Sequence, residues 1–208
     1  MRRNGIKIMW GLIKLLKPLA HIMALCILLG AAGFFCAIAV TVLAANLLLT
    51  SLNLSPWDLT FSAGAAVMLV CATARAVLRY GEQLCGHFIA FKLLAILRDK
   101  IFSVLRRLAP AKLEGRNRGD LISLITSDIE LLEVFYAHTV APVCIAVLVS
   151  AVMTLAIGSF HPVLGLTALL SYLIVGCVIP LASSRLGRSQ GMEVRNQLGE
   201  MNGFFLES

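Results

Sequence analysis

The longest uncharged stretch of the sequence constrains the fold more than any other feature. No Asp, Glu, Lys or Arg occurs from Leu19 to Thr50, and roughly 20 apolar residues are enough for a helix to cross a bilayer. Three further apolar runs follow it along the chain. We therefore predict an all-α membrane protein with four long transmembrane helices, at about 19–50, 61–80, 129–160 and 162–183.

The composition supports a membrane protein over other classes. The 208 residues are 59% hydrophobic and only 14% charged, and the mean hydropathy is +0.90, outside the usual range of soluble domains. A net charge of +7 in so apolar a chain is typical of cytoplasmic loops and anionic headgroups, so we expect no nucleic-acid partner. The six cysteines are scattered without a C-x-x-C pair, so we expect no disulfide framework and no metal site.

The position of the basic residues predicts the orientation of the chain. Every Lys and Arg lies before the first span, at the inner end of the second span or in the following hairpin, or after the fourth span. The two loops on the other side, around Ser51–Leu59 and Gly158–Pro162, contain none. By the positive-inside rule both termini of this chain face the cytoplasm.

Residues 1–18 have the pattern of a helix lying in the membrane interface. Lys7, Gly11 and Lys14 share one stripe, apolar residues cover the rest, and Pro18 permits a bend before the first span. The alternative is a disordered basic tail. We predict an N-terminal interfacial elbow helix at 1–18, followed by one membrane domain at 19–208.

The second span is predicted to continue far into the cytoplasm. A helix from Phe61 to Ala109 is about 73 Å long at 1.5 Å per residue, against a hydrocarbon core of roughly 30 Å. Apolar residues recur at helical spacing along the protruding part, at Leu94, Leu97, Ile101, Val104 and Leu108. We expect a cytoplasmic hairpin at about 81–128.

A short amphipathic helix is predicted at the tip of this hairpin, at about 119–128. Pro110 ends or kinks the descending helix, Asp120 can cap the short one, and Ser127 to Glu130 fit a capping box. Its apolar side either docks on a partner or packs into its own hairpin. We predict partner docking.

Several motifs resemble those of the transmembrane domain of ABC exporters. The pattern G-D-L-x-S-x-x-x-x-D occurs at 119–128, behind an elbow helix and an extended pair of spans. More narrowly, RYGEQLCGH at 79–87, LAPAKL at 108–113, RGDLISLITSDIE at 118–130 and LEVFYAHTVAP at 132–142 resemble the CydC half of the CydDC exporters.

This resemblance implies an ATP-driven heterodimer in the bacterial plasma (inner) membrane. It would move a small thiol such as cysteine or glutathione out of the cytoplasm, support cytochrome bd assembly and have a link to heme b. The implied partners are a CydD-like half-transporter, membrane lipid and nucleotide-binding domains that hold ATP and Mg. The sequence has no G-x-x-x-x-G-K-[ST] motif, so we assign it no catalytic residue and expect a fragment or truncated subunit.

The resemblance also assigns roles to individual residues. It makes the short helix at the tip a coupling helix seated in a nucleotide-binding domain, and His87 a heme ligand. The coupling-helix residues are Gly119, Asp120, Leu121, Ile122, Ser123, Leu124 and Asp128.

Arg75 and Arg79 are the candidate binding residues. They lie four residues apart on one helix face at the inner part of the second span. Charges in a span are costly and tend to face a cavity or partner, so both could attract a substrate carboxylate or a heme propionate. The alternative is that both side chains extend to the lipid headgroups.

A second class of function is also open at this stage. The chain could be a self-contained four-helix membrane protein that binds heme and transfers electrons. Such a bundle usually needs pairs of histidines facing each other within the bilayer. The spacing of His21, His87, His138 and His161 predicts no such pair, and only His87 receives a role.

Overall fold

The computed structural model describes residues 17–54, 57, 59–108, 135–187, 193 and 197. Within these residues all regular structure is helical, and four helices are long and apolar enough to span a membrane. They cover Lys17–Ser51, Phe61–Arg107, His138–Phe160 and Pro162–Leu186. The predicted all-α membrane fold with four spans is confirmed. The coupling helix and nearly all of the elbow helix lie outside the described residues.

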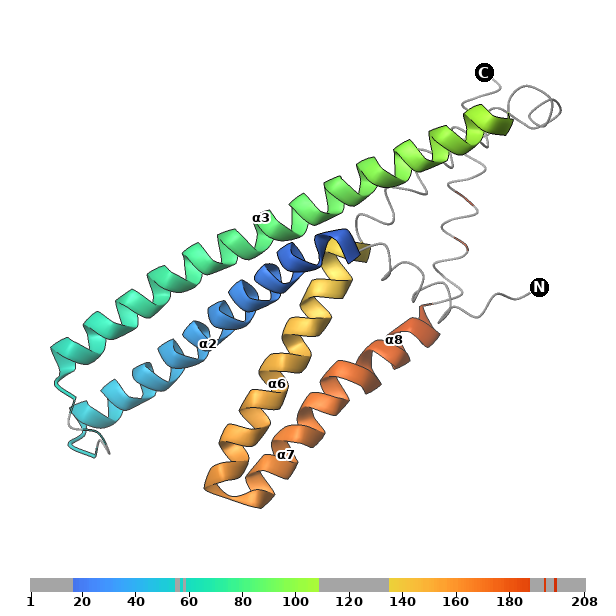
Figure 1. Cartoon of the computed structure of the whole chain (residues 1–208). Coiled ribbons are helices and arrows are strands. Elements are labelled where there is room, and N and C mark those ends of the chain that lie inside the picture. The colour runs from blue at the N-terminus through green and yellow to red at the C-terminus, as the bar shows by residue number, and fades with distance from the viewer. Residues whose placement is uncertain are drawn as a thin grey trace. The chain divides into compact units, whose positions relative to one another are not determined.

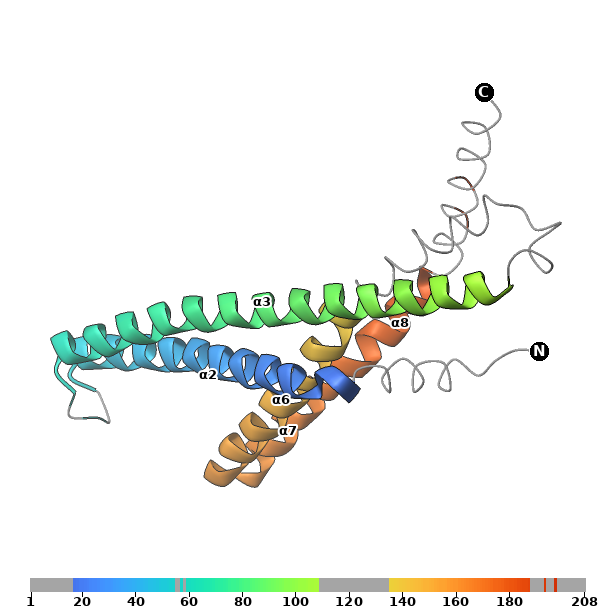
Figure 2. The same cartoon turned by 45° about the horizontal axis from the view of Figure 1, so that its top comes forward.

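The chain divides into two compact units, Met1–Val149 and Ser150–Ser208. In the first, α2 (Ala20–Ser51) follows a short 3-10 turn at Lys17–Leu19, and α3 covers Phe61–Leu108. The two helices lie side by side in opposite directions, and α3 continues well past the start of α2 (Figures 1 and 2).

Helix α3 has 48 residues and is therefore about 72 Å long. That is more than twice the thickness of a hydrocarbon core. The uninterrupted helix predicted through the charged part of the sequence is confirmed, because no proline occurs between Phe61 and Pro110 and the apolar spacing stays helical.

Three helices of the first unit meet in one buried cluster. The third is the beginning of α6 (Ala141–Phe160), which follows a π-helical turn, η3 (Tyr136–Val140). Small or aliphatic side chains allow the three backbones to come close. The buried members are Leu19 of the 3-10 turn, Met23 and Cys26 of α2, Ile89 and Leu93 of α3, and Ala141 of α6.

Each π-helical turn ends two residues before a proline. The turn η3 precedes Ala141 and Pro142, and the turn η4 (Ile174–Val178) precedes Ile179 and Pro180. Proline has no N–H, and its ring clashes with the carbonyl four residues earlier, so a wider turn relieves the conflict. The predicted fourth span is therefore divided into α7 (Pro162–Leu173), η4 and α8 (Ile179–Leu186).

The second unit contains a tight helical hairpin. The end of α6 connects to α7 through His161, whose Nδ1 accepts a hydrogen bond from the backbone N–H of Val163 at 3.3 Å. The backbones of Gly158 and Gly165 are in close contact beyond this turn. A Cβ atom added at Gly165 would lie 2.6 Å from the Cα of Gly158, a distance that real structures do not tolerate.

Gly165→Ala is expected to destabilise this hairpin by about 1–3 kcal/mol, because backbone atoms cannot move aside as a flexible side chain can. Gly158→Ala is the matched control: a Cβ there would lie 3.6 Å from the Cα of Gly165, which is ordinary contact. Thermal unfolding of the purified variants in one detergent measures the difference. Equal melting temperatures for the two variants would contradict the close packing.

Candidate functional site

A hollow of about 220 Å³ lies between α2 and α3. Gly30, Gly33 and Phe34 of α2 line one side, and Arg75, Arg79 and Glu82 of α3 line the other. The two glycines leave the room that side chains would otherwise fill. Both arginines predicted as binding residues thus line one cavity.

An ion pair occupies one end of this hollow. Nη1 of Arg79 donates to both carboxylate oxygens of Glu82, at 2.7 Å to Oε1 and 2.6 Å to Oε2. The two residues are three apart on α3, so one turn of helix brings them together. Glu82 is 6% exposed, whereas the side chain of Arg79 is 55% exposed. Charges of this kind stay buried only when they are paired.

Glu82 is buried because three helices converge on it. A Cβ added at Gly30 of α2 would lie 3.1 Å from Cδ of Glu82 and would collide with Cδ1 of Ile145 in α6. The thiol of Cys26 also donates to the backbone oxygen of Glu82 at 3.4 Å. Glycine at position 30 therefore makes room for both the carboxylate and the isoleucine.

Arg75 lies one turn from the ion pair and is exposed in the hollow. Within the described part of the chain it makes no ion pair or hydrogen bond. It is about 21 Å along α3 from Phe61, a depth at which a span is still within the membrane. Unpaired cations at such depths tend to face a substrate or ion pathway. Of the two predicted arginines, Arg75 is the one without a partner among the described residues and is therefore available to an anion.

The structure brings His87 next to His138, a contact that the sequence analysis did not predict. The ring centroids are 5.9 Å apart and the rings are nearly perpendicular, at 79°. Phe91 stacks on the other side of His87, with centroids 6.1 Å apart and an interplanar angle of 25°. The spacing of the histidines in the sequence did not indicate this contact.

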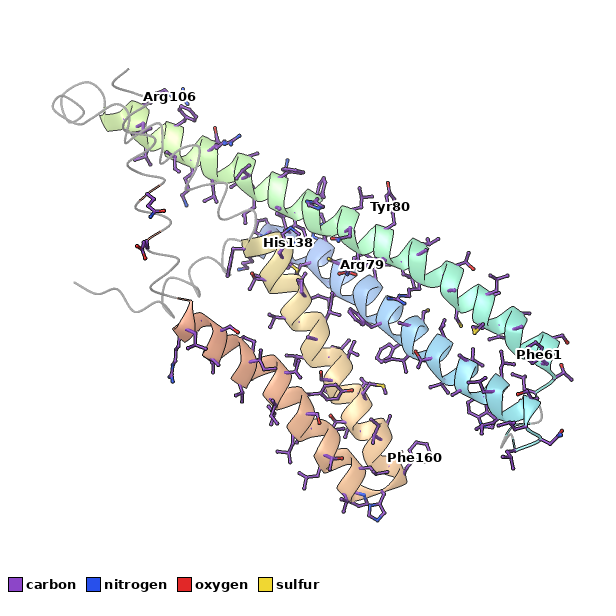
Figure 3. All side chains as sticks on the ribbon, turned by 180° about the vertical axis from the view of Figure 1, so that it is seen from behind. Phe61, Arg79, Tyr80, Arg106, His138 and Phe160 are labelled. Atoms are coloured by element: carbon purple, nitrogen blue, oxygen red, sulfur yellow. The ribbon has the colours of Figure 1, made fainter. Side chains whose placement is uncertain are left out.

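His138 belongs to η3 and lies where the start of α6 meets the middle of α3 (Figure 3). The sequence signal for this contact is Pro142, which favours a π-helical turn and so changes the direction of the side chains before it. Both histidine side chains are exposed.

Sequence reasoning also missed Glu82 as a site residue. The sequence pattern that could have identified it is a carboxylate three residues after Arg79 in a largely apolar run. Two opposite charges at this spacing lie on one helix face and can form an ion pair. Gly30 and Gly33 were predicted to permit close helix contact, and they also shape the hollow.

Arg79→Ala is expected to lower the stability of the membrane domain by about 1–3 kcal/mol, because it leaves a buried carboxylate without its donor. The double variant Arg79→Ala with Glu82→Gln should recover part of this loss, since the amide carries no charge. Thermal unfolding of both variants and of Glu82→Gln completes the cycle. Additive losses in the double variant would show that the two side chains do not interact.

Comparison with known proteins finds relatives of the whole chain. No family model matches the chain. Over all 208 residues it is 50% identical to a probable ABC transporter ATP-binding/permease protein of Haemophilus influenzae, 38% of whose length it covers.

Two glutathione/L-cysteine transport system ATP-binding/permease proteins are more distant relatives. The CydC protein of Escherichia coli is 31% identical over 77% of this chain, and the CydD protein of Bacillus subtilis is 28% identical over 87% of it. The alignments cover 30% and 32% of those two proteins, so the chain spans about a third of the length of its curated relatives. With its four membrane-spanning helices, the chain belongs to the ABC transporter family and forms part of an exporter transmembrane domain.

Proposed function

We propose that this chain is the transmembrane part of an ATP-driven exporter of the CydDC type. In this proposal it moves a small thiol such as cysteine or glutathione out of the cytoplasm. The hollow lined by Arg75 carries the proposal. Cysteine and glutathione each have a carboxylate, and the guanidinium of Arg75 has no ion-pair partner among the described residues and could bind it. The names of the two more distant relatives support the same substrate class.

Arginine is suited to this task because its planar guanidinium can make two parallel hydrogen bonds to one carboxylate. The pairing of Arg79 with Glu82 keeps the hollow from carrying two uncompensated cations, so that one anionic group is sufficient to neutralise it. Water is scarce at this depth, which strengthens the attraction. A hollow of about 220 Å³ is smaller than a typical ligand site, so we infer that other parts of the transporter complete it.

The motor in this proposal lies outside the chain. The named relatives are ATP-binding proteins, and we infer that nucleotide-binding domains hold ATP and Mg and act on the coupling helix at 119–128. The long helix α3 would transmit the motion to the hollow, because a continuous helix is stiff along its axis. A CydD-like half-transporter would supply the opposite wall. The proposed location is the bacterial inner membrane with both termini in the cytoplasm.

Heme and cytochrome bd assembly enter the proposal through the resemblance, with His87 as a heme ligand. Two observations support the residue assignment: the imidazole of His87 is exposed, and a second imidazole lies beside it. Heme would supply redox chemistry when bound. The resemblance suggests Arg75 and Arg79, two to three turns away along α3, as partners for its propionates; since Arg79 is paired with Glu82, we assign this role to Arg75.

The self-contained electron-transfer protein is the second candidate, and the histidine pair is the observation that favours it. The 50% identity to an ABC transporter over the whole chain favours the exporter. The 48-residue helix also has no use in a compact heme bundle.

Arg75→Ala is expected to raise the KM for the exported thiol by about tenfold to a hundredfold, the equivalent of one charged hydrogen bond at ~1.5–3 kcal/mol. The measurement is ATP-dependent uptake of radiolabelled cysteine and glutathione into inside-out vesicles that contain the complete transporter. Arg106→Ala is the matched control, because Arg106 is an exposed arginine at the far end of α3 (Figure 3). Wild-type KM values for Arg75→Ala would exclude Arg75 as the anion site.

Leu121→Asp is expected to uncouple ATP hydrolysis from transport, because a carboxylate on the apolar side of the coupling helix opposes docking in a nucleotide-binding domain. Thiol uptake should fall at least about tenfold while ATP hydrolysis continues and the membrane domain keeps its melting temperature. Coupled transport at the wild-type rate would contradict the docking role of this segment.

A further inference from the structure

The hollow between α2 and α3 has two chemically different walls. The α3 wall carries the two arginines and the glutamate described above. The α2 wall consists of Gly30, Gly33 and Phe34 and has no polar side chain among the described residues. A ligand that fills the hollow therefore needs a charged part on one side and an apolar part on the other.

Phe34 supplies the side-chain surface of the α2 wall, since the other two residues are glycines. Its side chain is 48% exposed, and among the described residues its ring makes no aromatic contact. A Cβ atom added at the adjacent Gly33 would lie 3.7 Å from Cβ of Leu78. Leu78 lies between Arg75 and Arg79 in the sequence, so Phe34 lies across the hollow from the part of α3 that carries both arginines.

The α3 wall suits the head group of an amino acid, which has a carboxylate and an ammonium on one carbon. The guanidinium of Arg75 binds the carboxylate through charged hydrogen bonds. Each carboxylate oxygen of Glu82 accepts one hydrogen bond from Arg79, and such an oxygen can accept a second one from the ammonium. With its head group on this wall, the amino acid directs its side chain towards Phe34.

The apolar α2 wall favours a thiol over a hydroxyl. A thiol behaves as a small hydrophobic group with a weak donor, and sulfur packs favourably against aromatic rings. A hydroxyl needs a hydrogen-bond partner, and burying it without one costs free energy. Neither the two glycines nor Phe34 has a side-chain donor or acceptor to offer.

We propose that Phe34 determines the specificity of the hollow for an amino acid with a thiol side chain over one with a hydroxyl. Its ring packs against the sulfur while the α3 wall binds the head group. A hollow of about 220 Å³ suits a single small amino acid, since sites for drug-sized ligands have roughly 300–1,000 Å³. This inference rests on the proposed function and deepens it, because it concerns the same hollow.

Direct binding to the complete transporter in lipid nanodiscs tests the inference. Isothermal titration calorimetry under reducing conditions gives the Kd of L-cysteine, of L-serine and of L-2-aminobutyrate, which has a methyl group in place of the thiol. We expect the wild type to bind cysteine about tenfold to a hundredfold more tightly than serine, the usual range for an apolar pocket that rejects a hydroxyl. Its affinity for 2-aminobutyrate should be about two- to tenfold below that for cysteine, because the sulfur contact is missing.

Two variants of Phe34 separate the apolar surface from the ring. Phe34→Ala should reduce the preference for cysteine over serine to within about threefold, because water then reaches the side chain of the ligand. Phe34→Leu keeps an apolar wall without a ring, so it should still disfavour serine but bind cysteine and 2-aminobutyrate equally. Arg75→Ala should weaken the binding of all three ligands by the same factor, since they share one head group.

Phe35→Ala is the matched control, because Phe35 is the adjacent phenylalanine of α2 and does not line the hollow. It should keep the wild-type preference. Melting temperatures without ligand verify that each variant is folded.

A wild type that does not bind cysteine, or that binds cysteine and serine equally, overturns the inference. A folded Phe34→Ala variant that keeps the wild-type preference does so too. Uptake of cysteine into inside-out vesicles is measured separately. Binding with the expected preference but without transport would contradict the proposed function alone, whereas transport without that preference would contradict only the role of Phe34.

Discussion

The ion pair between the buried carboxylate of Glu82 and Arg79 is the interaction on which the inner part of this membrane domain depends. A charge at 6% exposure among apolar helices is stable only beside a partner, and Arg79 supplies that partner from one turn away. The ion pair also limits the size of the side chains that can lie beside it. Glycine at position 30 leaves room for Glu82 and Ile145, whose side chains would have to shift to admit a Cβ there. The junction of α2, α3 and α6 and the shape of the hollow both follow from this pair.

Helix α3 connects every candidate site of the chain. It carries Arg75 in the hollow, the ion pair, His87 and then the segment that leads to the predicted coupling helix. A regular helix has a rise of 1.5 Å per residue, so Arg75 and His87 are about 18 Å apart along one rigid element. In the proposed exporter a movement at the cytoplasmic end would reach both sites without a flexible connection between them.

Much of this architecture was predictable from local patterns. Uncharged runs predicted the four spans, because a helix in lipid must satisfy its own backbone hydrogen bonds and bury no charge. The spacing of Arg75 and Arg79 placed them on one face of a helix, and both line the hollow. The pairing of Arg79 with Glu82 was also indicated by their i, i+3 spacing, although no role was predicted for Glu82. The side chain of Arg79 consequently differs from that of Arg75, which has no such partner among the described residues.

By itself, the sequence determined the class of fold, the number of spans, the length of α3 and the candidate arginines, because hydropathy and helical spacing act over a few neighbouring residues. Only the tertiary structure decided which residues from different helices meet. Gly30 faces Glu82 and Ile145, and His87 faces His138, because of the register in which α2, α3 and α6 pack. That register depends on side-chain volumes at the contacts and on the π-helical turn before Pro142, and neither leaves a periodic signal in the sequence.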